Sequence, residues 1–566
     1  MSLARSPAVG QNQTRSLPNP VPLRSPMLRL IPQSLRSGLR PWQVLILFVG
    51  LGGLTLANHP FWRDEVNPWL IARDSGTWLE FWQNIRYEGH PLLWYLCLAA
   101  LQRVTDSLVS MQVLHFLLGT AGVVLFCYYS PFRPLEKALF SFGYYPFYEY
   151  LILSRNYVFG LTGTFLCCLL FPYRTRSYLP LALTLGIMAN SHAYVLFVAA
   201  FLGLMLGLEF LCDRSHRQSY WQRSHPLDLV LSLVVFIGLL ALSAYMISPP
   251  RDSQLHGGTD FFLNFDLHRL LVAIGKLPGA YLLVPPNSKH WLDLIVMDLL
   301  GLGIFVGTAL FLVRKPFVLI FYALATTVTT FVFFYTKSIG GFRHFGSLYI
   351  IWIASLWLAH HYAPCDRLKT LFKLPDPLLL RVQKWMPRLL VLVLSLHCGT
   401  GFVMMGRELA VPWSASRATA QYMQKNDLDR AFIVASRDAI MAPLAGYLHR
   451  RFYYPETEAM GSFTLFLPTR QEATPEVTLA QTQEILSGQR SIAPEIPSQV
   501  LLLLNYRLDP PPPSASDPNP INPPATPATW TIGSLILQPI AQFERSYIHD
   551  EKYFLYQVSL TTSRQS

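Results

Sequence analysis

Polar side chains suited to chemistry stand where long apolar runs of this 566-residue chain begin or end. Asp64 and Glu65 follow the first run. Arg155 opens a later run, and Arg343 with His344 comes directly before another. A carboxylate can act as a general base toward a hydroxyl or an amine. An arginine presents a planar fork that suits phosphate oxygens.

One acid beside two or more cations fits a transfer reaction in which phosphate departs. The acid removes a proton from the acceptor, and the positive charges stabilise the phosphate as it leaves. Since a phosphate ester leaves without a general acid, the pattern differs from glycoside hydrolysis, which uses a pair of carboxyl groups.

Four further polar residues lie near the same ends of the apolar runs: Glu88, His90, Tyr157 and His192. Ionisable residues at such places cost free energy unless they are paired or hydrated, which makes them functional candidates. His90 precedes Pro91, so it also fits a simple helix start. His192 carries a weaker signal than the two arginines.

Structural roles for these residues are open alternatives. Asp64 would pair with Arg63 at a charged helix start, and each arginine would extend its head group to the membrane surface. Neighbouring side chains point about 100° apart on a helix or to opposite faces of a strand. Only one of Asp64 and Glu65 is therefore expected to face a shared cavity.

The composition predicts a membrane protein. Hydrophobic residues make up 52% of the chain and charged residues 14%, against roughly 25% charged residues in soluble domains. Several apolar runs approach the 20 or so residues that a helix needs to cross a bilayer. The net charge of +12 comes largely from short loops between these runs, where basic residues set orientation. The pattern therefore predicts no nucleic-acid partner.

The two ends of the chain differ from the apolar middle. Residues 1–40 contain six arginines and no acidic residue, which predicts a disordered cytoplasmic tail before the first span. A signal peptide cleaved after Ala57 is the alternative. The seven cysteines lie in or beside apolar runs without the paired spacing of a metal site, so no metal ligands are assigned.

Basic residues predict about eleven spans across residues 41–405. The spans are 42–58, 109–129, 137–153, one ending near Arg174, one ending near Asn190, its successor before Arg214, 227–248, 291–313, 316–335, 343–361 and 389–405. Every inner loop then carries Lys or Arg, including the loop 363–388, as the positive-inside rule requires. Residues 59–90 become an extracytoplasmic segment of surface helices. The stretch 90–104 becomes a short re-entrant or surface helix, since a full span there would reverse every later loop.

Residues 406–566 are predicted to form a small α/β domain on the extracytoplasmic side. Alternating and periodic apolar residues predict helices at Ala415–Gln424 and Ala439–His449. They predict strands at Ala431–Ala435, Val500–Leu504 and Tyr553–Leu560. A Pro-rich loop is expected at 509–528, because proline cannot pair in a sheet.

Three motifs in order resemble a known family. Trp62–Glu65 (WRDE) and Glu88–Tyr95 (EGHPLLWY) are similar to the first outer loop of GT-C membrane glycosyltransferases. The nearest branch is that of the protein O-mannosyltransferases and aminoarabinose transferases. Ser154–Tyr157 (SRNY) resembles the Arg-x-Tyr element of that branch. The motifs fall within roughly residues 42–210, and Leu92 stands where the branch usually has a second proline.

The resemblance implies a GT-C-like fold and an inverting transfer of a sugar from a polyprenyl-phosphate donor. The acceptor, on the extracytoplasmic side of an inner or plasma membrane, would be a lipid, a glycan or a protein. Asp64 would activate the acceptor, and Glu65 would shape the site or aid a metal. The substrate-binding residues would be Arg155, Tyr157, Arg343, His344, His90, His192 and Glu88. No cofactor is assigned, and a divalent cation is an open alternative.

Three rival functions use the same features. A transporter or lipid flippase would line its path with these charges, although the inverted repeats typical of transporters are not evident in the sequence. A polysaccharide polymerase or ligase of another fold is the second rival. A membrane scaffold whose outer domain binds partners is the third.

Overall fold

The computed structural model describes residues 40–254, 261–284, 289–337, 341–492, 495–509 and 529–561. The predicted basic tail, 1–40, and the predicted Pro-rich loop, 509–528, lie outside the described residues apart from Arg40 and Asp509.

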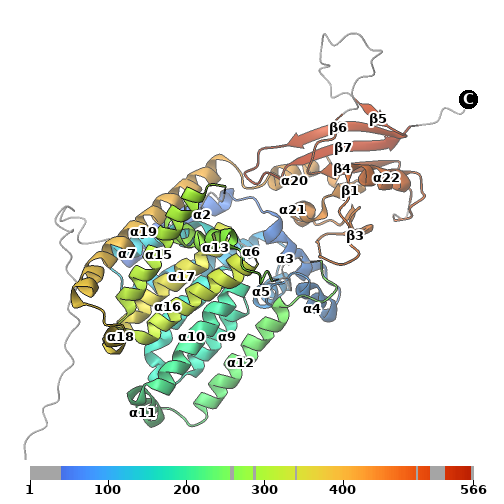
Figure 1. Ribbon diagram of the computed structural model, residues 1–566. Coiled ribbons are helices and arrows are strands. Elements are labelled where there is room, and N and C mark those ends of the chain that lie inside the picture. The colour runs from blue at the N-terminus through green and yellow to red at the C-terminus, as the bar shows by residue number, and fades with distance from the viewer. Residues whose placement is uncertain are drawn as a thin grey trace, which may run out of the picture. The chain divides into compact units, whose positions relative to one another are not determined.

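Helices dominate the described chain as far as Ala410, and the long ones run side by side in Figure 1. Within the described ranges, eight helices are long and apolar enough to cross a membrane. These are Pro41–Asn58 (α2), Leu108–Tyr129 (α6), Val158–Thr175 (α8 and the short η3), Ala193–Cys212 (α10), Asp228–Ile247 (α12), Trp291–Leu312 (α15), Pro316–Thr336 (α16 and the π-helical η4) and Asp376–Ala410 (α19). The predicted helical membrane architecture is confirmed at this level.

Two more predicted spans are shorter helices. The first, α9 (Leu179–Ala189), has 11 residues. The second, α17 (Phe342–Leu358), has 17 residues and continues into one 3₁₀ turn, η5 (Ala359–His361). Nearly all of α17 is buried, so this helix lies inside the bundle.

The predicted span 137–153 is wrong as a continuous helix. Here α7 (Pro134–Ser141) ends, and a π-helical turn, η2 (Tyr144–Glu149), follows after a break. Pro146 has no N–H to offer a continued α-helix. Residues 150–157 are then turns, so the segment delivers Arg155 on irregular backbone.

The segment between α2 and α6 is helical, as predicted. It holds α3 (Arg63–Asp74), α4 (Trp78–Arg86) and α5 (Leu93–Gln102). Trp62 caps α3, and the Glu65 side chain accepts a hydrogen bond from the Trp62 N–H (3.2 Å), the return half of a capping box.

Two regions between predicted spans contain helices. The stretch 249–290 includes α13 (Leu267–Ile274) and α14 (Lys276–Leu282). The basic stretch 363–388 includes α18 (Arg367–Leu371) and the first third of α19. Hydropathy marks only the apolar part of α19, whereas the Lys, Arg, Gln and Leu residues before it also favour helix.

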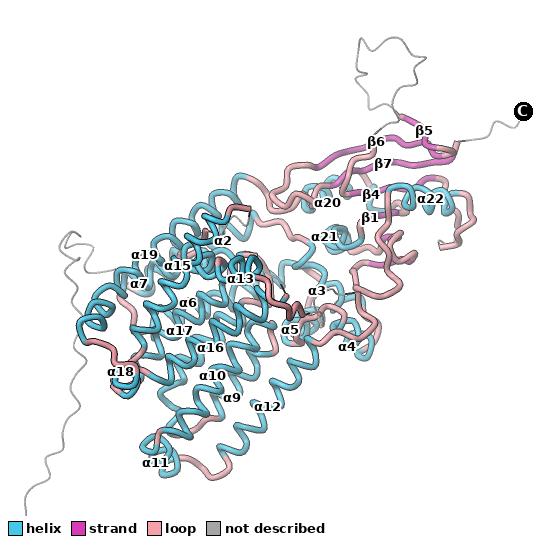
Figure 2. Tube along the Cα trace, viewed as in Figure 1, coloured by secondary structure: helices cyan, strands magenta, loops and turns pink. Residues whose placement is uncertain are grey.

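A seven-stranded mixed sheet forms the centre of the tail domain, and Figure 2 shows the strands confined to this part of the chain. The strands are β1 (Ile433–Ser436), β2 (Phe452–Tyr454), β3 (Ala459–Gly461), β4 (Gln499–Leu504), β5 (Trp530–Ile532), β6 (Leu535–Phe543) and β7 (Tyr553–Leu560). Their order is β3-β2-β1-β4-β7-β6-β5. Strand β1 runs parallel to β2 and β4, with Ile433 opposite Leu501, and the other pairs are antiparallel.

Helices cover both faces of the sheet. The helices are α20 (Ser416–Lys425), α21 (Asp438–Leu448) and α22 (Pro475–Leu486), with a short η6 (Leu428–Arg430). Helix α21 packs on one face, in an apolar core that also contains residues of α3. Helix α22 packs on the other face. The predicted small sheet domain is confirmed, and its core is continuous with that of α3.

The remaining helix, α11 (Arg214–Arg223), joins α10 to α12. Near α11, Arg174 donates two hydrogen bonds to the Glu209 carboxylate, from Nε to Oε2 at 2.7 Å and from Nη2 to Oε1 at 2.8 Å. This ion pair fixes the ends of η3 and α10 to each other.

Candidate active site

Three elements that are distant in the sequence bring Asp64, Arg155 and Arg343 together. Asp64 lies in the first turn of α3, and Arg155 lies in the turns after η2. Arg343 lies in the first turn of α17, whose N-cap residue is Gly341. Asp64 and Arg343 lie at helix starts, whereas Arg155 lies in the turns three residues before α8 (Val158–Leu170).

The Asp64 carboxylate is shared by the two arginines. Its Oδ2 atom lies 2.7 Å from Nη1 of Arg155 and 3.1 Å from Nη1 of Arg343. Nη1 of Arg155 also donates to the carbonyl oxygen of Asp64 at 2.9 Å. The third neighbour, Arg63, is more distant, with its Nε atom 3.9 Å from Oδ1.

These contacts keep Asp64 ionised. Burial alone would raise the pKa of its carboxyl, but the charges of Arg155 and Arg343 outweigh burial and lower it. Because the side chain of Asp64 is 24% exposed and that of Arg343 34%, both are open to an incoming ligand. A phosphate entering here would compete with Asp64 for the two guanidinium groups.

Glu65 is turned away from this cluster. Its side chain is fully buried, and its Oε1 accepts the backbone N–H of Ser154 at 2.5 Å. Its Oε2 lies 3.0 Å from Nε2 of His59 and also accepts the Trp62 N–H. Both oxygens are therefore occupied by protein donors, so Glu65 does not fit a metal ligand. It fixes the backbone next to Arg155 instead.

His59 extends the contacts of Glu65 to α19. Its other ring nitrogen, Nδ1, lies 3.0 Å from Oε1 of Glu408. Glu408 also accepts from the Tyr148 hydroxyl at 2.5 Å and from Arg407 at 2.8 Å. Burial opposes the charge on His59, but the two carboxylates outweigh it and raise its pKa to about 9. A charged imidazole thus joins two carboxylates from different helices.

Glu88 lies beside the cluster and has a different electrostatic state. It accepts from Asn67 at 3.0 Å and from the Tyr95 hydroxyl at 3.3 Å. Burial raises its pKa to about 7, against the opposing effects of Asn67 and the Arg155 charge. Glu88 therefore titrates near neutral pH within electrostatic range of Arg155.

The three predicted histidines gather around Tyr157. The ring centroids of His192 and Tyr157 are 4.2 Å apart, and those of His90 and His192 are 5.3 Å apart. His344 lies 5.8 Å from Tyr157 and 6.4 Å from His192. Burial and the Arg155 charge lower the pKa of His90 to about 4. His90 is thus a neutral hydrogen-bonding group at physiological pH.

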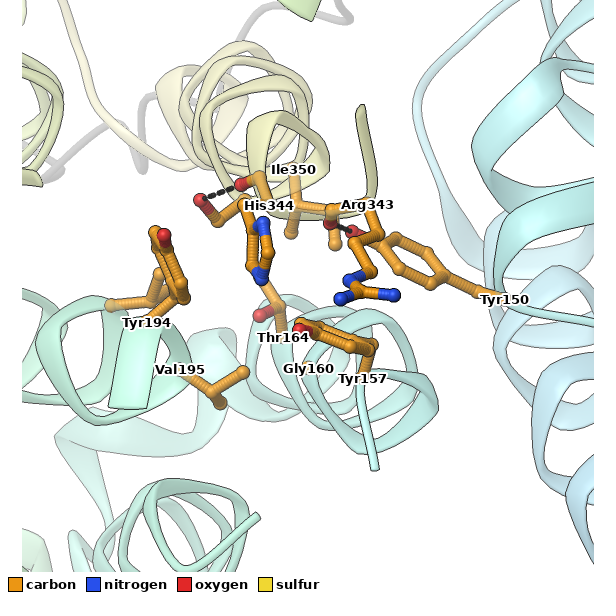
Figure 3. Close-up of a pocket in the computed structure, with 11 residues that line it drawn as sticks. Tyr150, Tyr157, Gly160, Thr164, Tyr194, Val195, Arg343, His344 and Ile350 are labelled. Atoms are coloured by element: carbon orange, nitrogen blue, oxygen red, sulfur yellow. Dashed lines mark hydrogen bonds between the residues drawn. The ribbon is translucent and has the colours of Figure 1, made fainter. Parts of the chain in front are cut away.

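A small cavity, with enclosed space for about one water molecule, lies next to Arg343. Figure 3 shows the Arg343 and His344 side chains, both from α17, pointing into it. The other walls come from α8, α10 and the 150–157 turns. The lining residues are Tyr150, Tyr157, Gly160, Thr164, Tyr194, Val195, Val198, Arg343, His344, Ser347 and Ile350.

The tail domain also reaches the cluster. Asp550 accepts from Nη1 of Arg63 at 2.5 Å, and Glu551 accepts from the Arg63 backbone N–H at 2.9 Å. Asn67 of α3 donates to the Thr464 carbonyl at 3.1 Å. The residue before Asp64 is therefore held by the domain that follows the last span.

Several residues of the site were not identified from the sequence. His59, Glu408 and Glu149 lie at or inside apolar segments, and Glu149 accepts from the Tyr144 hydroxyl at 2.6 Å. An acidic residue within an apolar run is a usable signal, and Glu149 and Glu408 both carried it. Thr164 and Tyr194 carry no such signal, because hydropathy does not tell which side of a helix faces a pocket.

No group of three or more His, Cys, Asp or Glu side chains in the described part of the chain is arranged to hold a metal ion. Comparison of the chain with protein-family models, with curated proteins and with solved structures finds no match. The chemistry of the site therefore follows from its own side chains.

Proposed function

We propose that this protein is an integral membrane glycosyltransferase that moves a sugar from a polyprenyl-phosphate donor to an acceptor. The observation that carries the proposal is the carboxylate of Asp64 held between Arg155 and Arg343. One base and two cations in contact are the groups that the reaction needs. The resemblance of the surrounding motifs to GT-C enzymes supports the same reaction.

The reaction follows from these groups. An acceptor O–H or N–H gives its proton to Asp64 as its heteroatom attacks the anomeric carbon of the donor sugar. The bond from that carbon to the phosphate oxygen breaks, and the bonding electrons leave with the polyprenyl phosphate. Arg155 and Arg343 stabilise the negative charge that develops on this phosphate. A single displacement inverts the anomeric centre.

Donor binding would also activate the base. Without donor, the two arginines lower the pKa of Asp64 and so weaken it as a proton acceptor. A phosphate that takes over the guanidinium hydrogen bonds brings a second negative charge close to Asp64, which raises that pKa. The acceptor is then deprotonated only when the donor is in place.

The eight apolar helices support a place within a membrane. The positive-inside rule, applied to the basic loops, supports a cytoplasmic N-terminus, a tail domain outside and an acid–arginine cluster at the outer face. An eleven-span GT-C-like arrangement would need α9, α17 and the broken segment of α7 and η2 to contribute spans besides the eight.

The test is a transfer assay in native membranes that contain the acceptor. The readout is the release of free polyprenyl phosphate from a labelled polyprenyl-phosphate sugar. Asp64→Asn should lower the rate by at least about 100-fold, the lower range for a general base, while the protein still binds donor. Asp74→Asn is the matched control, because Asp74 lies on the same helix and pairs with Arg73 instead.

Undiminished release by Asp64→Asn would reject the proposed base. Movement of intact donor across the membrane, with the sugar–phosphate bond uncleaved, would favour the transporter or flippase alternative instead.

A further inference from the structure

A groove of about 390 Å³ lies between α9, α10 and α12, at the end of the bundle where α11 joins α10 to α12 (Figure 1). Helix α12 packs mainly against α9, which leaves space between α12 and α10. Apart from Tyr178 and Ser232, the walls consist of Leu, Phe, Ala and Gly residues. The volume lies within the range of ligand sites, and the apolar walls suit a hydrocarbon chain.

Two glycines of α10 set the shape of the groove. A Cβ atom at Gly203 would clash with the Phe236 ring, so α10 and α12 are in close contact there. One turn nearer to α11, a Cβ atom at Gly207 would meet no atom within 4 Å. The groove is therefore closed by Phe236 at its inner end and is hollow toward α11.

The α11 end of the groove has excess positive charge. Residues 171–230 contain five arginines and three acidic residues. All three acids already accept hydrogen bonds from the protein: Glu209 from Arg174, Asp228 from the Tyr178 N–H and the Tyr220 hydroxyl, and Asp213 from the His216 N–H. In the described part of the chain, Arg174 is the one arginine of the five that has a carboxylate within 4 Å. Four arginines at this end thus carry charge that no carboxylate neutralises.

Arg217 is fixed at the rim of the groove. Its Nη1 atom donates to the carbonyl oxygens of Phe210 and Leu211, at 2.9 and 2.7 Å, and both residues line the groove. Its Nε and Nη2 atoms make no hydrogen bond within the described residues, and their N–H groups suit a phosphate oxygen. Trp221 of the same helix is half exposed, as is typical of tryptophan at the level of lipid head groups.

One hydroxyl group at the groove has no protein partner. Ser232 Oγ is buried and makes no hydrogen bond within the described residues. Ser232 is the fifth residue of α12 and lies about 6 Å along the helix axis from its start. A glycerolipid has its ester carbonyls at this depth, between the head group and the hydrocarbon chains. The hydroxyl therefore favours a glycerolipid over an isoprenoid, which has no acceptor there.

We infer that this groove binds one anionic phospholipid. An acyl chain fills the space between α10 and α12, the Ser232 hydroxyl donates to an ester carbonyl, and Arg217 holds the phosphate. Basic groups between membrane helices bind anionic head groups in the same way. The site is independent of the proposed transfer reaction, because no residue of the acid–arginine cluster lines the groove.

Titration of the purified full-length protein with lipids, followed by native mass spectrometry, tests the head-group preference. The probes are phosphatidylglycerol and phosphatidylcholine with the same acyl chains. The wild type should bind phosphatidylglycerol at least about fivefold more tightly, the value of one basic residue near a head group. Arg217→Gln should lose most of this preference, whereas Arg381→Gln, at an exposed position of α19, should keep it. Equal affinity of the wild type for the two lipids would overturn the inference.

Filling the groove tests its location. Gly207→Leu should lower the affinity for phosphatidylglycerol at least about tenfold, because the new side chain occupies the hollow without a clash. Gly303→Leu is the matched control, since a Cβ atom at Gly303 of α15 also meets no atom within 4 Å. Wild-type phospholipid binding by Gly207→Leu would overturn the inference.

Polyprenyl phosphate is the third probe and separates this site from the proposed donor site. Gly207→Leu should bind it as the wild type does, since Arg155 and Arg343 lie outside the groove. A loss of polyprenyl phosphate affinity in this variant would assign the groove to the donor chain and overturn the phospholipid site, while the transferase proposal would stand.

Discussion

At the scale of residues, the proposed function depends on one carboxylate that two arginines share. Asp64 receives 2.7 Å and 3.1 Å contacts from Arg155 and Arg343, whereas its neighbour Glu65 points into the interior. The 100° separation of adjacent helical side chains accounts for the split. Residue types at the ends of apolar runs were enough to select Asp64 and both arginines from the sequence.

The part of the site that sequence reasoning missed depends on which side of a helix faces inward. Thr164 and Val195 lie in segments that are apolar nearly all round. Such helices have no polar face that indicates their orientation. Only packing against α17 sets which residues line the pocket.

The charge state of Glu88 predicts a pH dependence of donor binding. Its pKa of about 7 means that it gains a negative charge as the pH rises through neutrality, close to Arg155. That charge repels the donor phosphate, so the KM for donor should rise severalfold between pH 6 and pH 8. Steady-state kinetics across this range should show the rise in the wild type.

The matched variants separate this effect from general changes with pH. Glu88→Gln should give a nearly flat KM, because the titrating group is gone. Glu80→Gln, in the exposed first turn of α4, should keep the wild-type profile. A Glu88→Gln protein with the full wild-type rise would show that another group titrates.

At the scale of elements, a buried chain of hydrogen bonds fixes the site to its supporting helices. His59 at the end of α2 joins Glu65 of α3 to Glu408 of α19, and Glu65 holds the backbone before Arg155. The long hydrophobic elements were predicted well, since length and hydropathy define them. The break at η2 and the polar start of α19 were not predicted, because hydropathy indicates neither a helix break nor a polar helix.

The charge on His59 predicts how stability changes with pH. Its folded-state pKa of about 9 lies above the usual 6.5, so its contribution is fully present below about pH 6.5. The contribution is lost as the pH rises through 9. The Tm of the wild type should therefore fall between pH 7 and pH 9.5.

Two histidine variants check the source of that fall. His59→Gln should have a lower Tm at pH 7 and a smaller decline toward pH 9.5. His225→Gln should decline like the wild type, because His225 is exposed in the turn before α12. Equal declines in all three proteins would contradict a role for His59.

At the scale of the whole molecule, the tail domain and the helical part meet beside the acid–arginine cluster. Helix α21 packs on α3, and the Ser416 hydroxyl donates to the Phe61 carbonyl at 2.5 Å. The strands β1, β4 and β7 were predicted from their apolar runs. Strands β2, β3, β5 and β6 were missed. Strand β6 pairs with β7 across an irregularity at Pro539, which weakens the alternating pattern.

The proposed orientation predicts which surfaces a membrane-impermeant thiol reagent reaches in intact cells. In a chain whose seven cysteines are replaced by serine, Ser487→Cys in the tail domain should react directly. Gln218→Cys in α11 should react only after permeabilisation. Both positions are exposed, so differences in burial do not confound the comparison. The reverse pattern would place the acid–arginine cluster on the cytoplasmic side.

The central claim is that Asp64 and a lipid-linked phosphate compete for the same two arginines. Titration of the purified protein with sugar-free polyprenyl phosphate tests this claim without any need for the acceptor. Asp64→Asn should bind severalfold more tightly than the wild type, because the competing carboxylate is gone, and Arg155→Gln should bind at least about tenfold more weakly. Weaker binding by Asp64→Asn, or wild-type binding by Arg155→Gln, would contradict the account.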